Sequence, residues 1–369
     1  SSAAMKIYEI INHLESIAPL SLQENYDNSG LIVGDKSKEV NVALISLDCT
    51  EEVVEEAINE NCELIIAHHP IVFEGLKKIT GSNYIERTIL KAIKNNIAIY
   101  AIHTNLDNVK EGVNGAIANK IGLVDTKILR PKSSNIKKLV VCCPLDSEQK
   151  LKDKLWEAGA GNIGNYSKCS FRSKGIGTFK GNNESNPSIG TKNTLHSENE
   201  IKIEMIFPTY LEHKILSTLF EAHPYEEVSY EVYTLENKNQ NIGSGIYGKL
   251  SKPMTSKAFL KFVKNEMKTD CIRHTEVCKE NIQTVAICGG SGSFLLDDAK
   301  RIGADIFISS DFKYHQFFDA DKEIIIADIG HYESEQFTKE LISDILKKKF
   351  TKFATRLSSV NTNPINYLK

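Results

Sequence analysis

Two adjacent histidines, His68 and His69, end a short apolar segment, ELIIA at residues 63–67. Strand ends are usually formed by Gly, Asn, Asp or Ser, which tolerate the backbone angles of a turn or hydrogen-bond to their own backbone. Two neutral imidazoles instead supply two nitrogen ligands, and Pro70 restricts the chain that follows them. The pair is therefore explained either by a metal ion or by ordinary hydrogen bonding, and the other polar positions must decide.

Further side chains with useful chemistry also follow predicted strands. They are His103, Asp107, His315, His331 and Glu335. His331 and Glu335 are four residues apart at the start of a predicted helix, so both project from one helix face. In an open α/β sheet, chemistry collects outside the carboxyl ends of the strands. The placement of these residues thus predicts one shared site.

A set of nitrogen and oxygen ligands emerges from these positions, and it consists of His68, His69, Asp107, His331 and Glu335. Such a mixed set suits Zn, Mn or Fe, and a carboxylate can bridge two ions. Each motif alone has a simpler explanation. A histidine pair can be hydrogen-bonded, a His and a Glu four apart can form a surface ion pair, and HTNLD can be a helix cap. Their joint occurrence at strand ends favours the metal site.

Alternating strand and helix patterns supply those strand ends. The alternation runs over residues 5–130 and returns over 248–369, which predicts one α/β domain with a parallel-rich sheet flanked by helices. Residues 134–240 follow the order βαββαβ, the ferredoxin-like plan, and lie between polar, turn-rich segments. This middle part is predicted to be an inserted domain. The stretch CGGSGSF predicts a tight turn from strand to helix, with an anion-binding loop as the alternative.

Composition limits the classes of function. A chain of 369 residues with 41% hydrophobic and 25% charged residues is typical of a globular protein of two or three domains. The net charge of −3 speaks against general nucleic-acid binding. No segment approaches the roughly 20 apolar residues of a membrane span. The eight cysteines show no Cys-x-x-Cys spacing, as expected for reduced thiols in a core.

Six sequence motifs resemble those of the Nif-three-like family. They are AHHP, HTNLD, GGSGS, SSDFKYHQ, DIGHYESE and NYDNSGLIVG. Members of this family are also called dinuclear metal-centre hexameric proteins or GTP cyclohydrolase type 2 homologues. The resemblance covers both α/β halves. The middle part, with EAHPYEEV, is similar to the PII-like or CutA-like insert of the longer bacterial members.

The resemblance implies a cytoplasmic, ring-shaped homohexamer built as a trimer of dimers, with two divalent metal ions (Zn, Fe or Mn) per subunit. By motif position it implies the metal ligands His68, His69, Asp107, His331 and Glu335, with Glu335 placed to bridge. His103 and His315 match histidines near the site and are candidates for proton transfer. No further cofactor is implied.

Two hypotheses of function follow. The first is a metal-dependent hydrolase of a small molecule, similar to a GTP cyclohydrolase. The alternative is a non-catalytic metal-binding or regulatory ring in which the insert senses a ligand. Fold analogy alone does not separate them.

Overall fold

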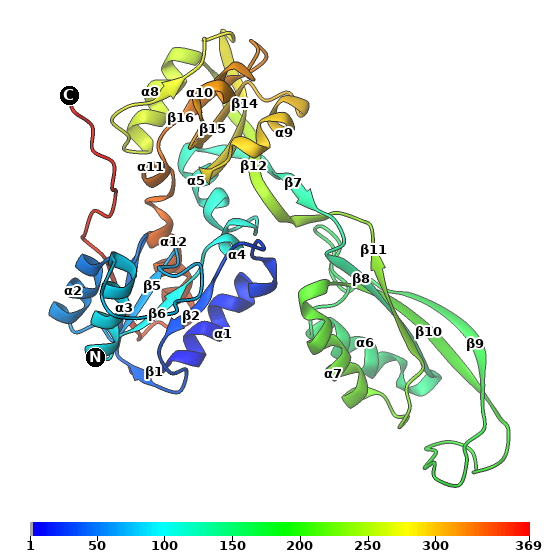
Figure 1. Cartoon of the computed structure of the whole chain (residues 1–369). Helices are drawn as coiled ribbons and strands as arrows, with labels where there is room; N and C mark the ends of the chain where they lie inside the picture. The colour runs from blue at the N-terminus through cyan, green and yellow to red at the C-terminus, as the bar shows by residue number, and fades with distance from the viewer. Residues whose placement is uncertain (1–2) are drawn as a thin grey trace. The chain divides into compact units, whose positions relative to one another are not determined.

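The computed structural model describes residues 3–369, which divide into two compact units. The first unit, here called the core unit, comprises the chain up to Arg130 together with Asn241–Lys369. The second, here called the insert, is Pro131–Gln240. Figure 1 shows the course of the chain through both units. Within residues 3–369, no helix has the length and apolar character needed to cross a bilayer.

One five-stranded sheet, here called sheet I, lies in the core unit in the order β17-β4-β5-β6-β2. Its strands are β17 (Ala354–Leu357), β4 (Val42–Ser46), β5 (Leu64–Ala67), β6 (Ala98–Ala101) and β2 (Gly30–Val33). All neighbours are parallel except β2, which is antiparallel to β6. Successive strand residues point to opposite faces, so Ile45 packs in one core cluster and Leu44 in another.

Helices bury both faces of sheet I. The helices are α1 (Ile7–Ile17) and α12 (Thr338–Lys349) on one face, and α2 (Glu51–Asn59) and α3 (Tyr84–Lys94) on the other. Side-chain caps start two of them, because Thr50 accepts a hydrogen bond from the Val53 amide and Asn83 accepts one from the Glu86 amide. A small two-stranded sheet, β1 (Met5–Lys6) with β3 (Glu39–Val40), adjoins α1.

A six-stranded sheet, here called sheet II, lies in the core unit in the order β13-β16-β15-β14-β12-β7. Its strands are β13 (Arg273–His274), β16 (Ile325–Asp328), β15 (Ile306–Ser310), β14 (Asn281–Ser291), β12 (Asn239–Thr255) and β7 (Leu123–Lys132). The neighbours β14, β15 and β16 are parallel. The helices α5 (Val113–Ile121) and α8 (Ser256–Glu266) cover one face, and α9 (Leu296–Arg301) and α10 (Tyr314–Phe318) the other.

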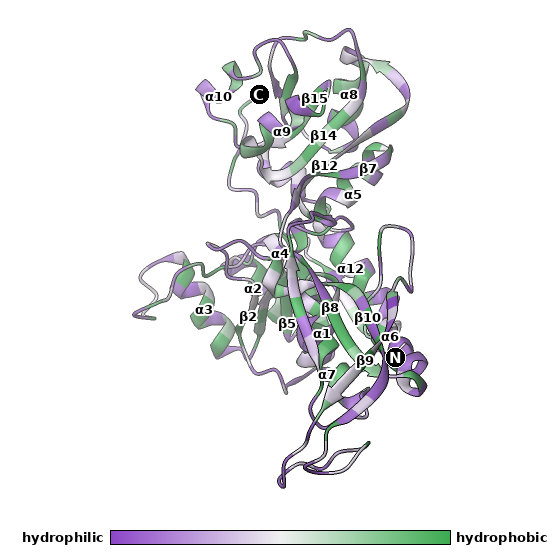
Figure 2. Ribbon diagram, turned by 90° about the vertical axis from the view of Figure 1, so that its right-hand side faces the viewer, coloured by the Kyte–Doolittle hydropathy of each residue, from purple (hydrophilic) through white to green (hydrophobic). Residues whose placement is uncertain are grey.

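The insert has its own hydrophobic core and the expected order of elements. They are β8 (Ile136–Pro144), α6 (Glu148–Glu157), β9 (Phe171–Phe179), β10 (His196–Pro208), α7 (Glu212–Ala222) and β11 (Tyr230–Leu235). The antiparallel sheet runs β11-β8-β10-β9, which is the ferredoxin-like arrangement. Figure 2 shows hydrophobic stretches on the strands of both units. The predicted fold class, α/β with a ferredoxin-like insert, is confirmed.

Three local features differ from the sequence-based expectation. The turn-rich stretch NYDNSGLIVG contains the edge strand β2, and sheet I gains the unpredicted strand β17. The predicted helix that starts with His331 and Glu335 ends at Glu335 as α11 (His331–Glu335), and α12 follows as a separate helix. The division has a packing reason, since α11 contacts β14 and β15 of sheet II whereas α12 contacts β4 and β17 of sheet I.

The described part of the chain also contains four short 3-10 turns: η1 (Leu20–Leu22), η2 (Leu145–Ser147), η3 (Thr209–Leu211) and η4 (Ser293–Leu295).

Candidate metal centre

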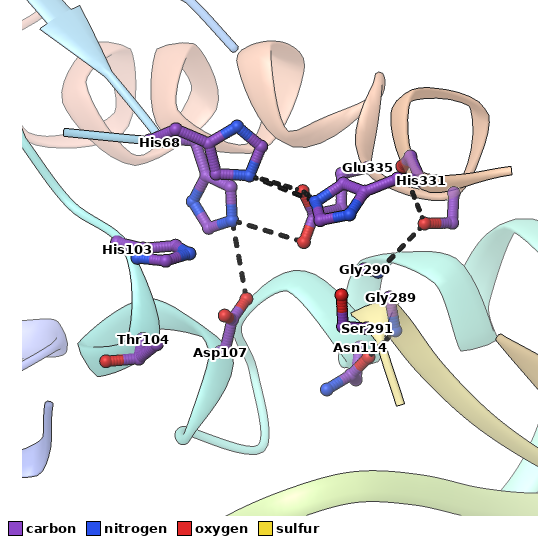
Figure 3. A network of polar contacts seen from close by, with 12 residues as sticks. His68, His103, Thr104, Asp107, Asn114, Gly289, Gly290, Ser291, His331 and Glu335 are labelled. Carbon is purple, nitrogen blue, oxygen red and sulfur yellow. Dashed lines mark hydrogen bonds and ion pairs between the residues drawn. The ribbon is translucent and has the colours of Figure 1, made fainter. Parts of the chain in front are cut away.

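Carboxyl ends of strands from both sheets of the core unit bring the five predicted ligands together. His68 and His69 directly follow β5, and Asp107 ends the short helix α4 (Thr104–Asp107) after β6. His331 and Glu335 begin and end α11, which follows β16. Figure 3 shows the side chains of His68, Asp107, His331 and Glu335 turned toward one another. The sheets therefore create a site that neither half of the sequence contains alone.

The carboxylate of Glu335 lies at the centre of this group and is only 2% exposed. Its Oε2 is 2.7 Å from His69 Nε2 and 3.1 Å from His331 Nε2. Its Oε1 is 3.6 Å from His68 Nε2, which is in turn 3.4 Å from Asp107 Oδ1. The two oxygens of one carboxylate thus face two different sets of ligands, the arrangement that a bridging carboxylate requires.

Among residues 3–369, three overlapping groups of side chains could each hold an ion, and two of them share Glu335. The two that share Glu335 are His69, His331 and Glu335, and His68, Asp107 and Glu335; the third is His68, His69 and His103. Within each group, the ligand atoms all lie within 4.8 Å of one another. The core unit thus contains His, Asp and Glu clusters able to bind metal.

Two buried polar atoms in this cluster face one another without making the hydrogen bonds that buried atoms normally make. His68 Nε2 and Asp107 Oδ1 are 3.4 Å apart, and among residues 3–369 neither has a hydrogen-bond partner. Leaving such groups unsatisfied in a protein interior costs about 1–3 kcal/mol each. Ligation of a cation by both atoms would remove this cost, so the residues fit a divalent metal.

Each of the four histidines at the site is held from behind through Nδ1. The acceptors and distances are Ile102 O at 2.7 Å for His68, Asp48 Oδ1 at 2.7 Å for His69, Asp27 Oδ1 at 2.9 Å for His103 and Asp311 Oδ2 at 2.6 Å for His331. Because these oxygens only accept, each Nδ1 donates its hydrogen to them, and Nε2 is the nitrogen left for a metal ion once it is free of its proton. Such partners orient metal-binding imidazoles and raise their basicity.

Asp48 and Asp311 were not among the sequence-predicted site residues. Asp48 follows β4 by two residues, and Asp311 follows β15 directly. Both therefore carried the signal that identified the other site residues, a polar side chain at the carboxyl end of a parallel strand. Asp27, in the NYDNSGLIVG segment before β2, was predicted from the sequence as an outer group of the site, and it also accepts a 2.9 Å hydrogen bond from the Thr104 amide.

The two histidines predicted to transfer protons lie in different surroundings. The ring nitrogens of His103 come within 4.8 Å of those of His68 and His69, which is close enough for His103 to bind a metal as well. His315 is exposed on α10, where its ring contacts Tyr314 and Phe318. The structure brings His103 into the cluster but leaves His315 outside the residues that line the cavity described next.

A cavity of about 980 Å³ opens onto the ligand cluster. His69, His103 and His331 form part of its lining, and Phe73, Tyr84 and Ile365 are among its apolar residues. No lysine or arginine of residues 3–369 belongs to the lining, whereas Asp48, Glu74, Asp311 and Glu333 do. Apart from its histidines, the described part of the lining therefore offers an anion no positively charged side chain.

The glycine-rich stretch at the carboxyl end of β14 leads into the expected turn toward α9 and also creates space for Glu335. A Cβ atom on Gly290 would lie 2.5 Å from Glu335 Oε1. The backbone of Gly290 has a φ of +70°, which side-chain-bearing residues rarely adopt. Glycine is thus needed here for two independent reasons.

In the metal-free protein, protons take the place of cations. Burial by itself would lower the pKa of His331, but hydrogen bonds to Asp311 and Glu335 outweigh burial and raise the pKa to about 10. Burial also opposes ionisation of Glu335, but the charges of His69 and His68 hold the pKa of Glu335 well below its ordinary value. Metal binding must displace these protons.

We expect metal-free protein to lose stability as pH rises from about 6.5 to about 10. The stabilisation from protonated His331 is fully present below its ordinary pKa of 6.5 and is lost as pH passes its raised pKa of about 10. The thermal midpoint of chelator-treated protein, measured across this range, checks the expectation. His331→Gln is the control. Any decrease of the thermal midpoint with pH that is present in the wild type and absent in this variant is due to His331. A wild-type curve parallel to that of His331→Gln would contradict the prediction.

Comparisons with known proteins found matches over nearly the whole length of the chain. The family model described as Duf34/NIF3 (NGG1p interacting factor 3) matches residues 5–364. The chain is 38% identical over 364 residues to a protein of Halalkalibacterium halodurans named GTP cyclohydrolase 1 type 2 homolog, covering 97% of this chain and 98% of that one. A Bacillus subtilis protein of the same name is 36% identical, covering 98% of each. A Bacillus cereus crystal structure, of a protein described as related to NIF3, has a TM-score of 0.86 at 37% identity and covers 99% of both chains.

Proposed function

Because the chain belongs to the Duf34/NIF3 family, we propose that it is a dinuclear metal-dependent hydrolase of a small molecule, with chemistry similar to that of a GTP cyclohydrolase. One observation carries the proposal: Glu335 turns its two carboxylate oxygens toward two different sets of ligands. A single structural ion would need only one such set.

The proposed ions are two of Zn, Fe or Mn. His69, His331 and Glu335 would hold one, and His68, Asp107 and Glu335 the other. Divalent ions supply Lewis acidity and lower the pKa of water, which is the chemistry that hydrolysis at neutral pH needs. The outer carboxylates Asp48 and Asp311 hold the imidazoles of His69 and His331 in place for this task.

His103 is the better supported of the two residues proposed for proton transfer. Asp27 accepts the Nδ1 hydrogen of His103, which leaves Nε2 as the atom that could take or return a proton. The His103 ring also lies 6.0 Å from the ring of Phe73, at the cavity wall. The role of His315 stays a prediction. Its ring contacts Tyr314 and Phe318, and it is not among the residues that line the cavity.

The cavity lining favours a substrate whose reacting part is an uncharged ring. Aromatic and aliphatic side chains such as Phe73, Tyr84 and Ile365 suit a flat apolar group, and binding pockets commonly combine such walls with a few polar groups. Because no lysine or arginine of the described residues lines the cavity, phosphate groups are better accommodated outside it or on the metals. A nucleotide bound with its base inward meets both conditions.

The regulatory alternative is supported by the independence of the insert. The insert has a separate hydrophobic core, and the candidate metal clusters all belong to the core unit. A domain with its own core could bind a ligand or a partner independently of the metal centre. Binding of a metabolite to residues of the insert alone, with no turnover by the metal-loaded protein, would support this alternative.

The proposal includes a homohexamer, arranged as a trimer of dimers, in the cytoplasm. The family resemblance supports both points. Light scattering during size-exclusion chromatography measures the assembly, for which we expect a mass six times the 41.2 kDa of one chain. Fractionation of cells that produce the native protein tests the localisation.

Metabolite turnover by metal-loaded protein tests the function. The protein is reconstituted with Zn, Mn or Fe and incubated with GTP and with a mixture of cell metabolites, and products are identified by mass spectrometry. We expect a product from the wild type and none from His69→Ala, because His69 supplies a ligand. Metal occupancy near two ions per chain without any product would favour the regulatory alternative, and absence of metal binding would exclude both.

A further inference from the structure

The C-terminal segment that follows β17 reaches the metal centre. The amide of Ser358 donates to Ile45 O at 2.8 Å, which keeps the chain beside β4. From there, residues 362–365 contribute to the lining of the cavity. In Figure 1 this segment is the red strand-free end of the chain, which leaves sheet I and runs past α11. The tail is thus part of the site, although Thr362 lies 314 positions from Asp48 in sequence.

A continuous chain of hydrogen bonds links this segment to a ligand. The Thr362 hydroxyl donates to Asp48 Oδ2 at 2.6 Å. The other oxygen of Asp48, Oδ1, accepts from His69 Nδ1 at 2.7 Å. Both oxygens of the carboxylate are therefore occupied, one by the tail and one by the imidazole. With the hydroxyl in place, the Asp48 carboxylate is held in the orientation that meets His69.

We propose that Thr362 is a positioning residue of the metal centre: its hydroxyl fixes Asp48, and Asp48 in turn fixes the ring of His69. This inference rests on the proposed metal-binding function. Outer hydrogen-bond partners commonly change metal affinity by 10–100-fold when they are removed. Because Thr362 acts through one intermediate side chain, we expect an effect of about 10-fold, at the low end of that range.

Metal affinity and the spectrum of Co²⁺-substituted protein test the proposal. Zn²⁺ affinity is measured by competition with a chelator, and visible absorption of Co²⁺ reports the ligand arrangement. Thr362→Val replaces the hydroxyl by a methyl group of similar size and should weaken metal binding about 10-fold and alter the Co²⁺ spectrum. Thr362→Ser keeps a hydroxyl and should restore both readouts toward the wild type.

Ser359→Ala is the matched control. The Ser359 hydroxyl donates to Glu56 at 2.8 Å, so this variant also removes one hydroxyl anchor from the same segment, but away from Asp48. We expect wild-type metal affinity and an unchanged Co²⁺ spectrum. An equal loss in Ser359→Ala, or failure of Thr362→Ser to restore the readouts, would mean that Thr362 only anchors the tail and would overturn the proposal.

A double-mutant comparison keeps the proposal testable if one variant is poorly folded. Asp48→Asn should weaken metal binding at least as much as Thr362→Val, and combining the two should add little, because the hydroxyl acts through Asp48. Additive losses would overturn the inference. Unchanged affinity and spectrum in Thr362→Val would overturn it too, while the proposed function would stand. Wild-type protein that binds neither Zn²⁺ nor Co²⁺ would instead refute the metal centre itself.

Discussion

Replacing Glu335 with glutamine should lower metal content from two ions per chain to one or none. The carboxylate contacts His69 and His331 through Oε2 and faces His68 through Oε1, so one substitution removes an anionic ligand from both groups. Glutamine keeps the size of the side chain but loses the charge and the second acceptor oxygen. Since loss of outer partners alone costs 10–100-fold, we expect affinity to fall by more than about 100-fold. Elemental analysis and chelator competition measure the two quantities.

Glu340→Gln serves as the control for Glu335→Gln. Glu340 is exposed on α12, and the substitution makes the same change of charge without touching the cluster. This variant should keep the metal content of the wild type. Full occupancy in Glu335→Gln would show that the carboxylate does not bridge, and the dinuclear proposal would then fail.

Replacing Gly290 with alanine should disrupt the same site from the backbone side. The new Cβ would lie 2.5 Å from Glu335 Oε1 and 3.4 Å from His331 Cε1, so the carboxylate must move. We expect loss of metal comparable to that in Glu335→Gln. The φ of +70° adds backbone strain of about 1–2 kcal/mol for a residue with a Cβ. Metal content reports the displacement of the Glu335 carboxylate, and the thermal midpoint of metal-free protein reports the backbone strain.

Gly303→Ala separates strain from contact. Gly303 has a similar φ of +74°, but a Cβ there would meet nothing within 4 Å. The control should therefore show a comparable loss of thermal stability and bind metal like the wild type. If Gly290→Ala also retains both ions, then Glu335 can bind them from another position, and the close fit between Gly290 and the carboxylate has no role in metal binding.

The sequence alone determined the types of ligand and their local placement. Apolar segments ending in His68 and His69 and the four-residue spacing of His331 and Glu335 are short-range features. A strand places the residue after it at the sheet edge, and a helical turn places residues four apart on one face. The βαββαβ order of the insert was equally readable, since periodicity and turn residues act over a few positions.

Tertiary structure decided which strand ends meet. His69 and Glu335 are 266 positions apart, and their 2.7 Å contact depends on how sheets I and II are packed in the core unit. The same packing explains the break between α11 and α12, because the chain passes there from one sheet to the other. No local pattern encodes that change of partner.

Tertiary structure also distinguished residues that look alike in sequence. His103 and His315 both follow strands, but only His103 turns toward the ligand cluster. Three further side chains support the site. Asp48 contacts the ring of His69, Asp311 contacts the ring of His331, and Thr362 contacts Asp48. An aspartate or threonine in a loop has many possible partners, and its role depends on the distant residue that folding places within hydrogen-bond range. The sequence thus determined the chemistry available at each strand end, while long-range packing decided which of those groups share one site.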